Sequence, residues 1–146
     1  MKAEGANVIT GGCLCGAVQY QVAGNPLFAV LCHCRDCQRA SGTGHVPVMG
    51  MPRPSFTVRG ETKSYTLRHA DGRASIRHFC PTCGSLLFGT AEVAPEAVSI
   101  YVGTLDEPSV FQPEAVLFTR DRHDWDVTVG TLPEFETMPP GETGGN

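Results

Sequence analysis

The chain has 146 residues, which is the usual length of one domain and is enough to bury one moderate core. Hydrophobic residues make up 41% and charged residues 18%, and no apolar run approaches the roughly 18 residues of a membrane span. The formal net charge of -4 argues against a broad positive surface for nucleic acid.

Short strands are predicted along the chain, because 17 glycines and 11 prolines separate short apolar or alternating runs. We expect strands at residues 17–22, 29–31, 46–51, 56–59, 64–67, 75–79, 86–89, 97–102 and 115–119. One short helix is expected over 34–40. The Asp71-Gly72 pair predicts a hairpin, and Pro52 and Pro54 predict a turn or a sheet edge.

These elements predict one domain over residues 1–138, followed by a flexible tail at 139–146, PPGETGGN. The N-terminal segment lacks the apolar core of a secretory signal, so we expect a cytoplasmic protein with reduced thiols. The basic cluster at Arg68, Arg73, Arg77 and His78 is interpreted as a solvated hairpin, because no aromatic residues interleave with it.

All seven cysteines fall into three clusters, whereas cysteines that serve only as small buried hydrophobes would be scattered. A disulfide framework is disfavoured by the odd number and by the expected reducing compartment. The clusters are Cys13 and Cys15; Cys32, Cys34 and Cys37; Cys80 and Cys83.

The two pairs predict a closed structural zinc site. In CPTCG, Cys80 and Cys83 have the spacing at which one tight turn brings two sulfurs to a metal. In GGCLCG, Cys13 and Cys15 lie two residues apart, so their side chains point the same way on an extended backbone. Together the pairs supply the four ligands of structural zinc.

The stretch CHCRDC then retains three sulfurs, Cys32, Cys34 and Cys37. Three protein ligands and one open position are typical of catalytic zinc. Alternatively His33 or His45 completes a second structural site. His33 is expected to point away from its neighbouring cysteines and to act in packing or as an orienting contact.

The segments GGCLCGAVQY, LCHCRDCQRASGTGH and FCPTCGSLLF, with Trp125 and LPEFE near the end, resemble the glutathione-dependent formaldehyde-activating enzyme family, also called the Gfa-like or CENP-V/GFA family. The resemblance runs from about Gly11 to Glu136. It implies a mainly β, Mss4-like fold of antiparallel sheets with zinc-binding knuckles and few short helices. It also implies structural zinc at Cys13, Cys15, Cys80 and Cys83, and catalytic zinc at Cys32, Cys34 and Cys37.

The family's activity adds glutathione to formaldehyde, so the first hypothesis is a carbon–sulfur lyase-like enzyme with two zinc ions, the second one labile. Its partners would be a small thiol such as glutathione and a small aldehyde, with no membrane or nucleic acid. The rival hypothesis is a noncatalytic zinc-stabilised binding module, and a third is redox or metal sensing by the thiolates.

Several further residues are candidates near the three sulfurs. Arg35 and Arg39 are candidates for pairing with substrate carboxylates, and the alternative is that they are surface residues on the short helix. Asp36 and His45 are candidates for proton transfer or for orienting contacts. The aromatic side chains Trp125, Phe111, Phe118 and Phe135 are expected in the core or as cover for the sheets.

Overall fold

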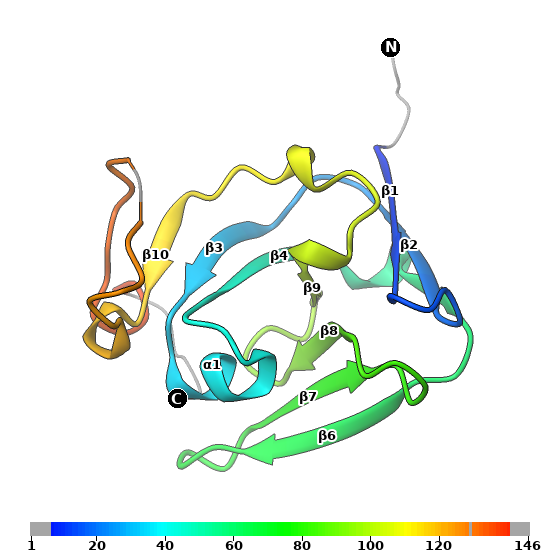
Figure 1. Cartoon of the computed structure of the whole chain (residues 1–146), viewed down its shortest axis with the longest axis horizontal. Helices are drawn as coiled ribbons and strands as arrows, with labels where there is room; N and C mark the ends of the chain where they lie inside the picture. Colours follow the sequence, from blue (N-terminus) through cyan, green and yellow to red (C-terminus); the bar gives the residue numbers. More distant parts are fainter. Residues whose placement is uncertain (1–6, 129, 141–146) are drawn as a thin grey trace.

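The computed structural model describes residues 7–128 and 130–140, and this part of the chain is mainly β, as predicted (Figure 1). The strands are β1 Val8–Gly12, β2 Gln19–Ala23, β3 Phe28–Cys32, β4 Val46–Pro52, β5 Thr57–Arg59, β6 Lys63–Arg68, β7 Ala74–Phe79, β8 Leu86–Ala91, β9 Ala97–Tyr101 and β10 Ala115–Leu117. The helical elements are α1 Arg35–Ser41 and the short 3-10 turns η1 Arg53–Ser55, η2 Val102–Thr104, η3 Pro108–Val110 and η4 Thr119–Asp121. The predicted tail at 139–146 lies outside the described residues from position 141 onward.

The strands form two sheets. A seven-stranded sheet has the order β10-β3-β4-β9-β8-β7-β6, and a three-stranded sheet has the order β1-β2-β5. Figure 1 shows the larger sheet curving from β10 at one end to β6 at the other. Neighbouring strands are antiparallel except for β10, which pairs with β3 in parallel. This pairing brings the chain after β10 to the end of β3, where the three-cysteine cluster begins.

Each predicted strand overlaps an observed one, and the hairpin at Asp71-Gly72 is confirmed by the antiparallel pairing of β6 and β7. The prediction missed β1, whose sequence VITGG does not alternate and ends in two glycines. Its glycine permits a close approach, because a Cβ atom at Gly11 would lie 2.3 Å from the Tyr20 hydroxyl and 2.5 Å from the Thr104 carbonyl oxygen. The pairing of β1 therefore depends on tertiary contacts that local propensity does not report.

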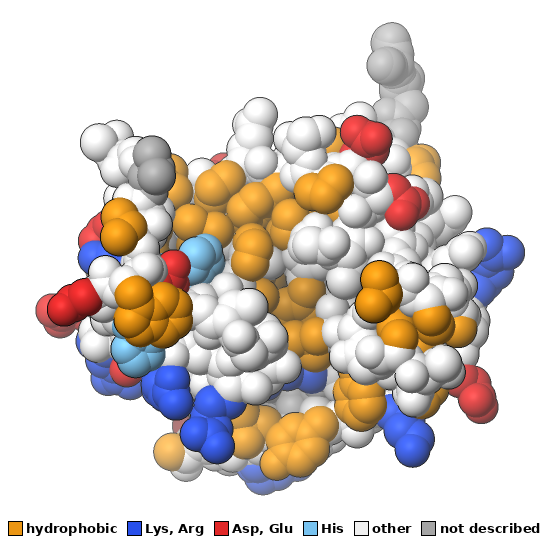
Figure 2. All heavy atoms as spheres, in the orientation of Figure 1, with side chains coloured by type: hydrophobic (Ala, Val, Ile, Leu, Met, Phe, Trp, Pro, Cys, Tyr) orange, Lys and Arg blue, Asp and Glu red, His pale blue; other side chains and the backbone are white. Residues whose placement is uncertain are grey.

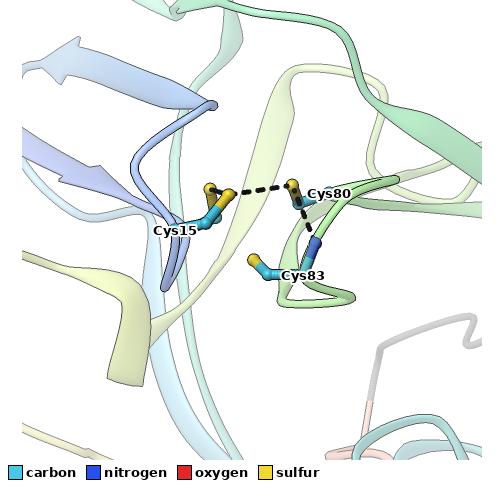
Figure 3. Close-up of side chains that lie close together, drawn as sticks. Cys15, Cys80 and Cys83 are labelled. Carbon is cyan, nitrogen blue, oxygen red and sulfur yellow. Dashed lines mark hydrogen bonds between the residues drawn. The ribbon is translucent and has the colours of Figure 1, made fainter.

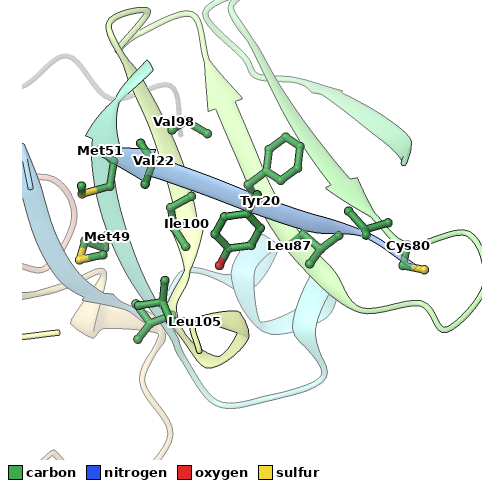
Figure 4. Packing of buried hydrophobic residues seen from close by; sticks show 12 residues of the cluster. Tyr20, Val22, Met49, Met51, Cys80, Leu87, Val98, Ile100 and Leu105 are labelled. Carbon is green, nitrogen blue, oxygen red and sulfur yellow. The ribbon is translucent and has the colours of Figure 1, made fainter. Parts of the chain in front are cut away.

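The main core lies between the two sheets, because alternate residues of β2 face the larger sheet. Tyr20 and Val22 are buried while their neighbours Gln19 and Gln21 are exposed. Figure 4 shows their side chains pointing toward those of β4, β8 and β9. The partners labelled there are Met49, Met51, Leu87, Val98, Ile100, Leu105 and Cys80. Burial of each large apolar side chain contributes about 1.5–3 kcal/mol to the stability of this layer.

Within the described residues, no helix has both the length and the apolar character needed to cross a membrane.

Candidate functional site

The structure brings the two distant cysteine pairs together at one end of the core. Cys13 and Cys15 follow β1, whereas Cys80 and Cys83 lie in the turn between β7 and β8 (Figure 3). The four sulfur atoms all lie within 4.8 Å of one another, and none of these cysteines forms a disulfide. The predicted grouping of the pairs is therefore present in the fold.

The spacing of these sulfurs fits a tetrahedral zinc ion. The Sγ atoms of Cys13 and Cys15 are 3.7 Å apart, and those of Cys15 and Cys80 are 3.8 Å apart. Zinc–sulfur bonds of about 2.3 Å in a tetrahedron place the sulfurs about 3.8 Å from one another. Two of the six sulfur–sulfur distances thus match tetrahedral zinc coordination, and the other four are at most 4.8 Å.

Polar groups around the four-cysteine cluster contact three of its sulfurs. The backbone N–H groups of Val18 and Thr82 donate to the sulfurs of Cys13 and Cys80 at 3.2 and 3.4 Å. The Ser85 hydroxyl lies 3.2 Å from the sulfur of Cys83 and lowers the pKa of that thiol to about 5. Such contacts to sulfur stabilise the charged ligand form.

The second cluster lies at the start of α1, where Cys32, Cys34 and Cys37 are all buried. Cys34 is the N-cap of the helix, and its sulfur accepts a hydrogen bond from the backbone N–H of Cys37 at 3.3 Å. Helix geometry therefore holds two of the three sulfurs on one side of the first turn. Among the described residues, no histidine or carboxylate ligand atom joins this group.

The three sulfurs cannot all ionise in the absence of a cation. Hydrogen bonds from Cys32 and Cys37 lower the pKa of Cys34 to about 2. The pKa of Cys32 is raised by its hydrogen bonds to Cys34 and Cys37 and by burial. For Cys37, the bond with Cys32 favours the thiolate, but the bond with Cys34 and burial raise the pKa to about 12. A divalent ion bound by three thiolates would displace the protons that remain on this cluster, so its affinity would fall as the pH falls.

A cavity of about 160 Å³ opens on the three-cysteine cluster. Arg77 reaches into it from β7, with a terminal nitrogen 3.8 Å from the sulfur of Cys37. Burial opposes the charge of Arg77, but the nearby Tyr101 and Cys37 groups raise its pKa. Its Nε atom is buried and has no hydrogen-bond partner among the described residues. The cavity thus combines three sulfurs with a guanidinium group whose Nε–H can still donate a hydrogen bond to a ligand.

Arg77 was missed as a candidate because the sequence interpretation placed it among solvated charges. That interpretation is wrong for Arg77 and for His78, whose ring stacks on Phe88 with a centroid distance of 4.6 Å. The alternation of side chains along β7 could have indicated this position, because residues two apart on a strand point to the same face. Ser75 and Arg77 share one face of β7, and both line the cavity.

The other arginine candidates lie elsewhere. Arg35 donates a hydrogen bond to Gln38, Arg39 is exposed, and neither lines the cavity within the part of the chain that the structure describes. Asp36 is partly exposed on α1 and does not join either cysteine group. The proposed contacts of these residues with substrate stay predictions.

The histidines form a separate group. His33 and His45 lie with Asp126 in a cluster of their own, and His33 points away from the cysteines as predicted. Neither histidine completes the three-cysteine group. Burial lowers the pKa of His33, which keeps its imidazole neutral.

The aromatic residues divide into two groups. Phe118 is buried, and Phe111 and Phe135 pack partly buried against the core. The prediction for Trp125 is wrong, because this side chain is 71% exposed and stacks on His123. Phe118 has a φ of 59°, a strained conformation for a residue with a side chain, at the edge of the cavity.

Comparisons with known proteins agree with this geometry. The profile of the family described as "Glutathione-dependent formaldehyde-activating enzyme" matches residues 8–121. A Halomonas elongata protein, whose curated name gives the same activity as a provisional assignment, is 30% identical over 124 residues, which cover 81% of this chain and 79% of that protein. A crystal structure of a Rhodobacter sphaeroides protein has a similar fold, with a TM-score of 0.56 and 23% identity, over 86% of this chain and 98% of that one.

Proposed function

Because the chain belongs to the family of glutathione-dependent formaldehyde-activating enzymes, we propose that it is a zinc-dependent carbon–sulfur lyase-like enzyme. The proposed reaction forms or cleaves the S-hydroxymethyl adduct of glutathione or another small thiol. The observation that carries this proposal is the group of three buried sulfurs, which borders a cavity and has no fourth protein ligand among the described residues.

In this proposal Cys13, Cys15, Cys80 and Cys83 hold a structural zinc ion, and Cys32, Cys34 and Cys37 hold an exchangeable one. When bound there, the second ion would supply a position for the thiol or the aldehyde oxygen and would favour the thiolate form. Zinc held by three thiolates carries a formal charge of -1 and is a weak Lewis acid, so placement of the reactants contributes much of the rate.

The reaction balances without a redox partner. One bond forms between the thiol sulfur and the carbonyl carbon, and the thiol proton ends on the carbonyl oxygen. Cleavage is the reverse of these steps. The chain's own contribution is to hold the two reactants together in a small cavity, with Arg77 available to pair with a carboxylate of the thiol.

The test is exchange spectroscopy by NMR on a mixture of formaldehyde and glutathione, with zinc content followed during stepwise chelation. We expect the protein to speed adduct exchange, and we expect this effect to disappear with the first zinc ion removed. Two zinc ions that both resist the chelator, together with an unchanged exchange rate, would contradict the proposal and would favour a noncatalytic binding module.

Replacing Arg77 by methionine should weaken the use of glutathione more than the use of an uncharged thiol. Loss of a hydrogen bond to a charged group costs about 1.5–3 kcal/mol, so we expect KM for glutathione to rise about 10- to 100-fold. The rate with 2-mercaptoethanol, which has no carboxylate, should change little. Both values come from the exchange assay run over a range of thiol concentrations.

The matched control is Arg68→Met, because Arg68 lies on the same hairpin, is exposed and donates only to the Gly72 carbonyl among the bonds described for it. This variant should behave as the wild type. Equal losses for both thiols in Arg77→Met would mean that the arginine acts on the cysteine cluster and not on the substrate carboxylate.

A further inference from the structure

A cluster without sulfur lies on the other side of the β3–α1 junction. The Nδ1 atom of His45 hydrogen-bonds the Oδ2 atom of Asp126 at 2.8 Å, and the Nδ1 atom of His33 lies 3.4 Å from the same oxygen. The two imidazole rings face each other with centroids 4.8 Å apart. Three potential metal ligands therefore converge from three separate segments of the chain.

The separations suit a common metal ion. Ligand atoms about 2.1 Å from a divalent ion, at tetrahedral to octahedral angles, lie about 3.0–3.4 Å from one another. The two distances to the oxygen of Asp126 are close to this range. Two imidazoles and one carboxylate are a ligand set for first-row transition ions such as zinc, iron and cobalt, and not for magnesium or calcium.

His33 provides an independent indication of a ligand. Its side chain is fully buried, and neither ring nitrogen has a hydrogen-bond partner among the described residues. A buried polar atom without a partner costs about 1–3 kcal/mol. The 3.4 Å contact of Nδ1 with Asp126 lacks hydrogen-bond geometry, so a bound ion would supply the partner that this nitrogen lacks.

Neighbouring groups hold the cluster in place. A Cβ atom at Gly44 would lie 2.5 Å from Oδ2 of Asp126, so the absence of a side chain there makes room for the carboxylate. Gln38, which is buried, donates to the carbonyl oxygens of His33 and Asp121 at 2.6 and 2.9 Å. Gly44 thus leaves room for the carboxylate of Asp126, and Gln38 ties the backbone at His33 to the backbone at Asp121.

One side of the cluster reaches solvent. The His45 side chain is 27% exposed and that of Asp126 is 14% exposed. Figure 2 shows histidine side chains at the surface beside acidic ones, on the side of the molecule where Figure 1 places the chain after β10. An ion could enter from this side and keep water at its remaining positions.

We propose that His33, His45 and Asp126 form a third metal site that binds a divalent first-row transition ion through two nitrogens and one oxygen. The bound ion fastens the segment after β10 to the β3–α1 junction. This site contains no sulfur, and its test does not depend on the proposed lyase activity.

The test titrates zinc-loaded protein with Co²⁺ while the fluorescence of Trp125, the only tryptophan in the chain, is recorded. Trp125 adjoins Asp126, so a paramagnetic ion bound there should quench its emission in a saturable manner with one cobalt ion per chain. The zinc content should stay unchanged, and the charge-transfer absorption of cobalt bound to thiolate should be absent.

Two variants and one control decide the outcome. Asp126→Asn and His45→Gln each lose a ligand, so the Co²⁺ affinity should fall by more than about 100-fold, beyond what losing an orienting contact costs. His45 is partly exposed, so its variant should fold even if the other does not. Asp124→Asn makes the same change two residues away at an exposed position and should bind as the wild type does. Equal quenching in wild type and in a folded Asp126→Asn or His45→Gln variant, or no saturable quenching in the wild type, would overturn the proposal.

Discussion

Replacing Cys80 by serine is expected to prevent stable folding. This side chain is fully buried, and its sulfur joins the turn between β7 and β8 to the segment after β1. In the proposed four-cysteine site, a serine hydroxyl would be a poor ligand for zinc. Structural zinc contributes about 10–16 kcal/mol of apparent binding free energy in zinc-finger peptides, comparable to the whole stability of a domain. We therefore expect either no soluble protein or a Tm at least about 10 °C lower.

The measurement is thermal unfolding followed by circular dichroism, together with zinc content per chain. Cys37→Ser is the matched control, because it changes a buried cysteine of the other cluster. It leaves intact the four-cysteine cluster, which joins the segment after β1 to the turn between β7 and β8. This control should retain its fold with a modest loss of stability. A Cys80→Ser protein with the Tm and the zinc content of the wild type would show that the four sulfurs do not stabilise the fold.

The strands and the turn were predictable where local sequence decides them. Asp71 and Gly72 form the predicted hairpin because Gly72 takes a φ of 89° and the carboxylate of Asp71 accepts the N–H of Arg73. The short helix was also predictable, and it spans Arg35–Ser41, shifted by one residue from the predicted range 34–40. Strand β1 was not predictable, since it depends on the close approach of the backbone at Gly11 to Tyr20 and Thr104.

The cysteine groups were predictable because the cysteines come in two closely spaced pairs and one closely spaced triplet. The cluster of His33, His45 and Asp126 was not predicted, because it needs two strand pairings. The antiparallel pairing of β3 with β4 brings the two histidines together, and the parallel pairing of β10 with β3 brings the segment with Asp126 to them. That pairing returns the chain to the β3–α1 junction after a long crossover. Single polar residues far apart in sequence give no spacing pattern that would indicate such a group.

Replacing Cys34 by serine should abolish the proposed catalysis while leaving the fold intact. Serine is a preferred N-cap, so its hydroxyl can accept the hydrogen bond from the Cys37 N–H that the sulfur accepts now. The change therefore preserves the start of α1 and removes one thiolate from the proposed open zinc site. Of the three thiols in the cluster, the one removed loses its proton most readily, since hydrogen bonds from Cys32 and Cys37 lower the pKa of Cys34 to about 2.

We expect the exchange of formaldehyde between solution and the glutathione adduct to slow at least about 100-fold, to the uncatalysed rate, because ligand loss exceeds the 10- to 100-fold cost of losing an orienting contact. One zinc ion per chain should be lost, and the Tm should stay within a few degrees of the wild type. Cys34→Ala separates the two roles of this residue, because alanine removes the helix cap as well as the ligand and should cost about 1 kcal/mol of stability in addition. A serine variant that retains both the exchange rate and the zinc content would contradict the assignment of Cys34 to the catalytic site, because the helix cap that it keeps has no part in either property.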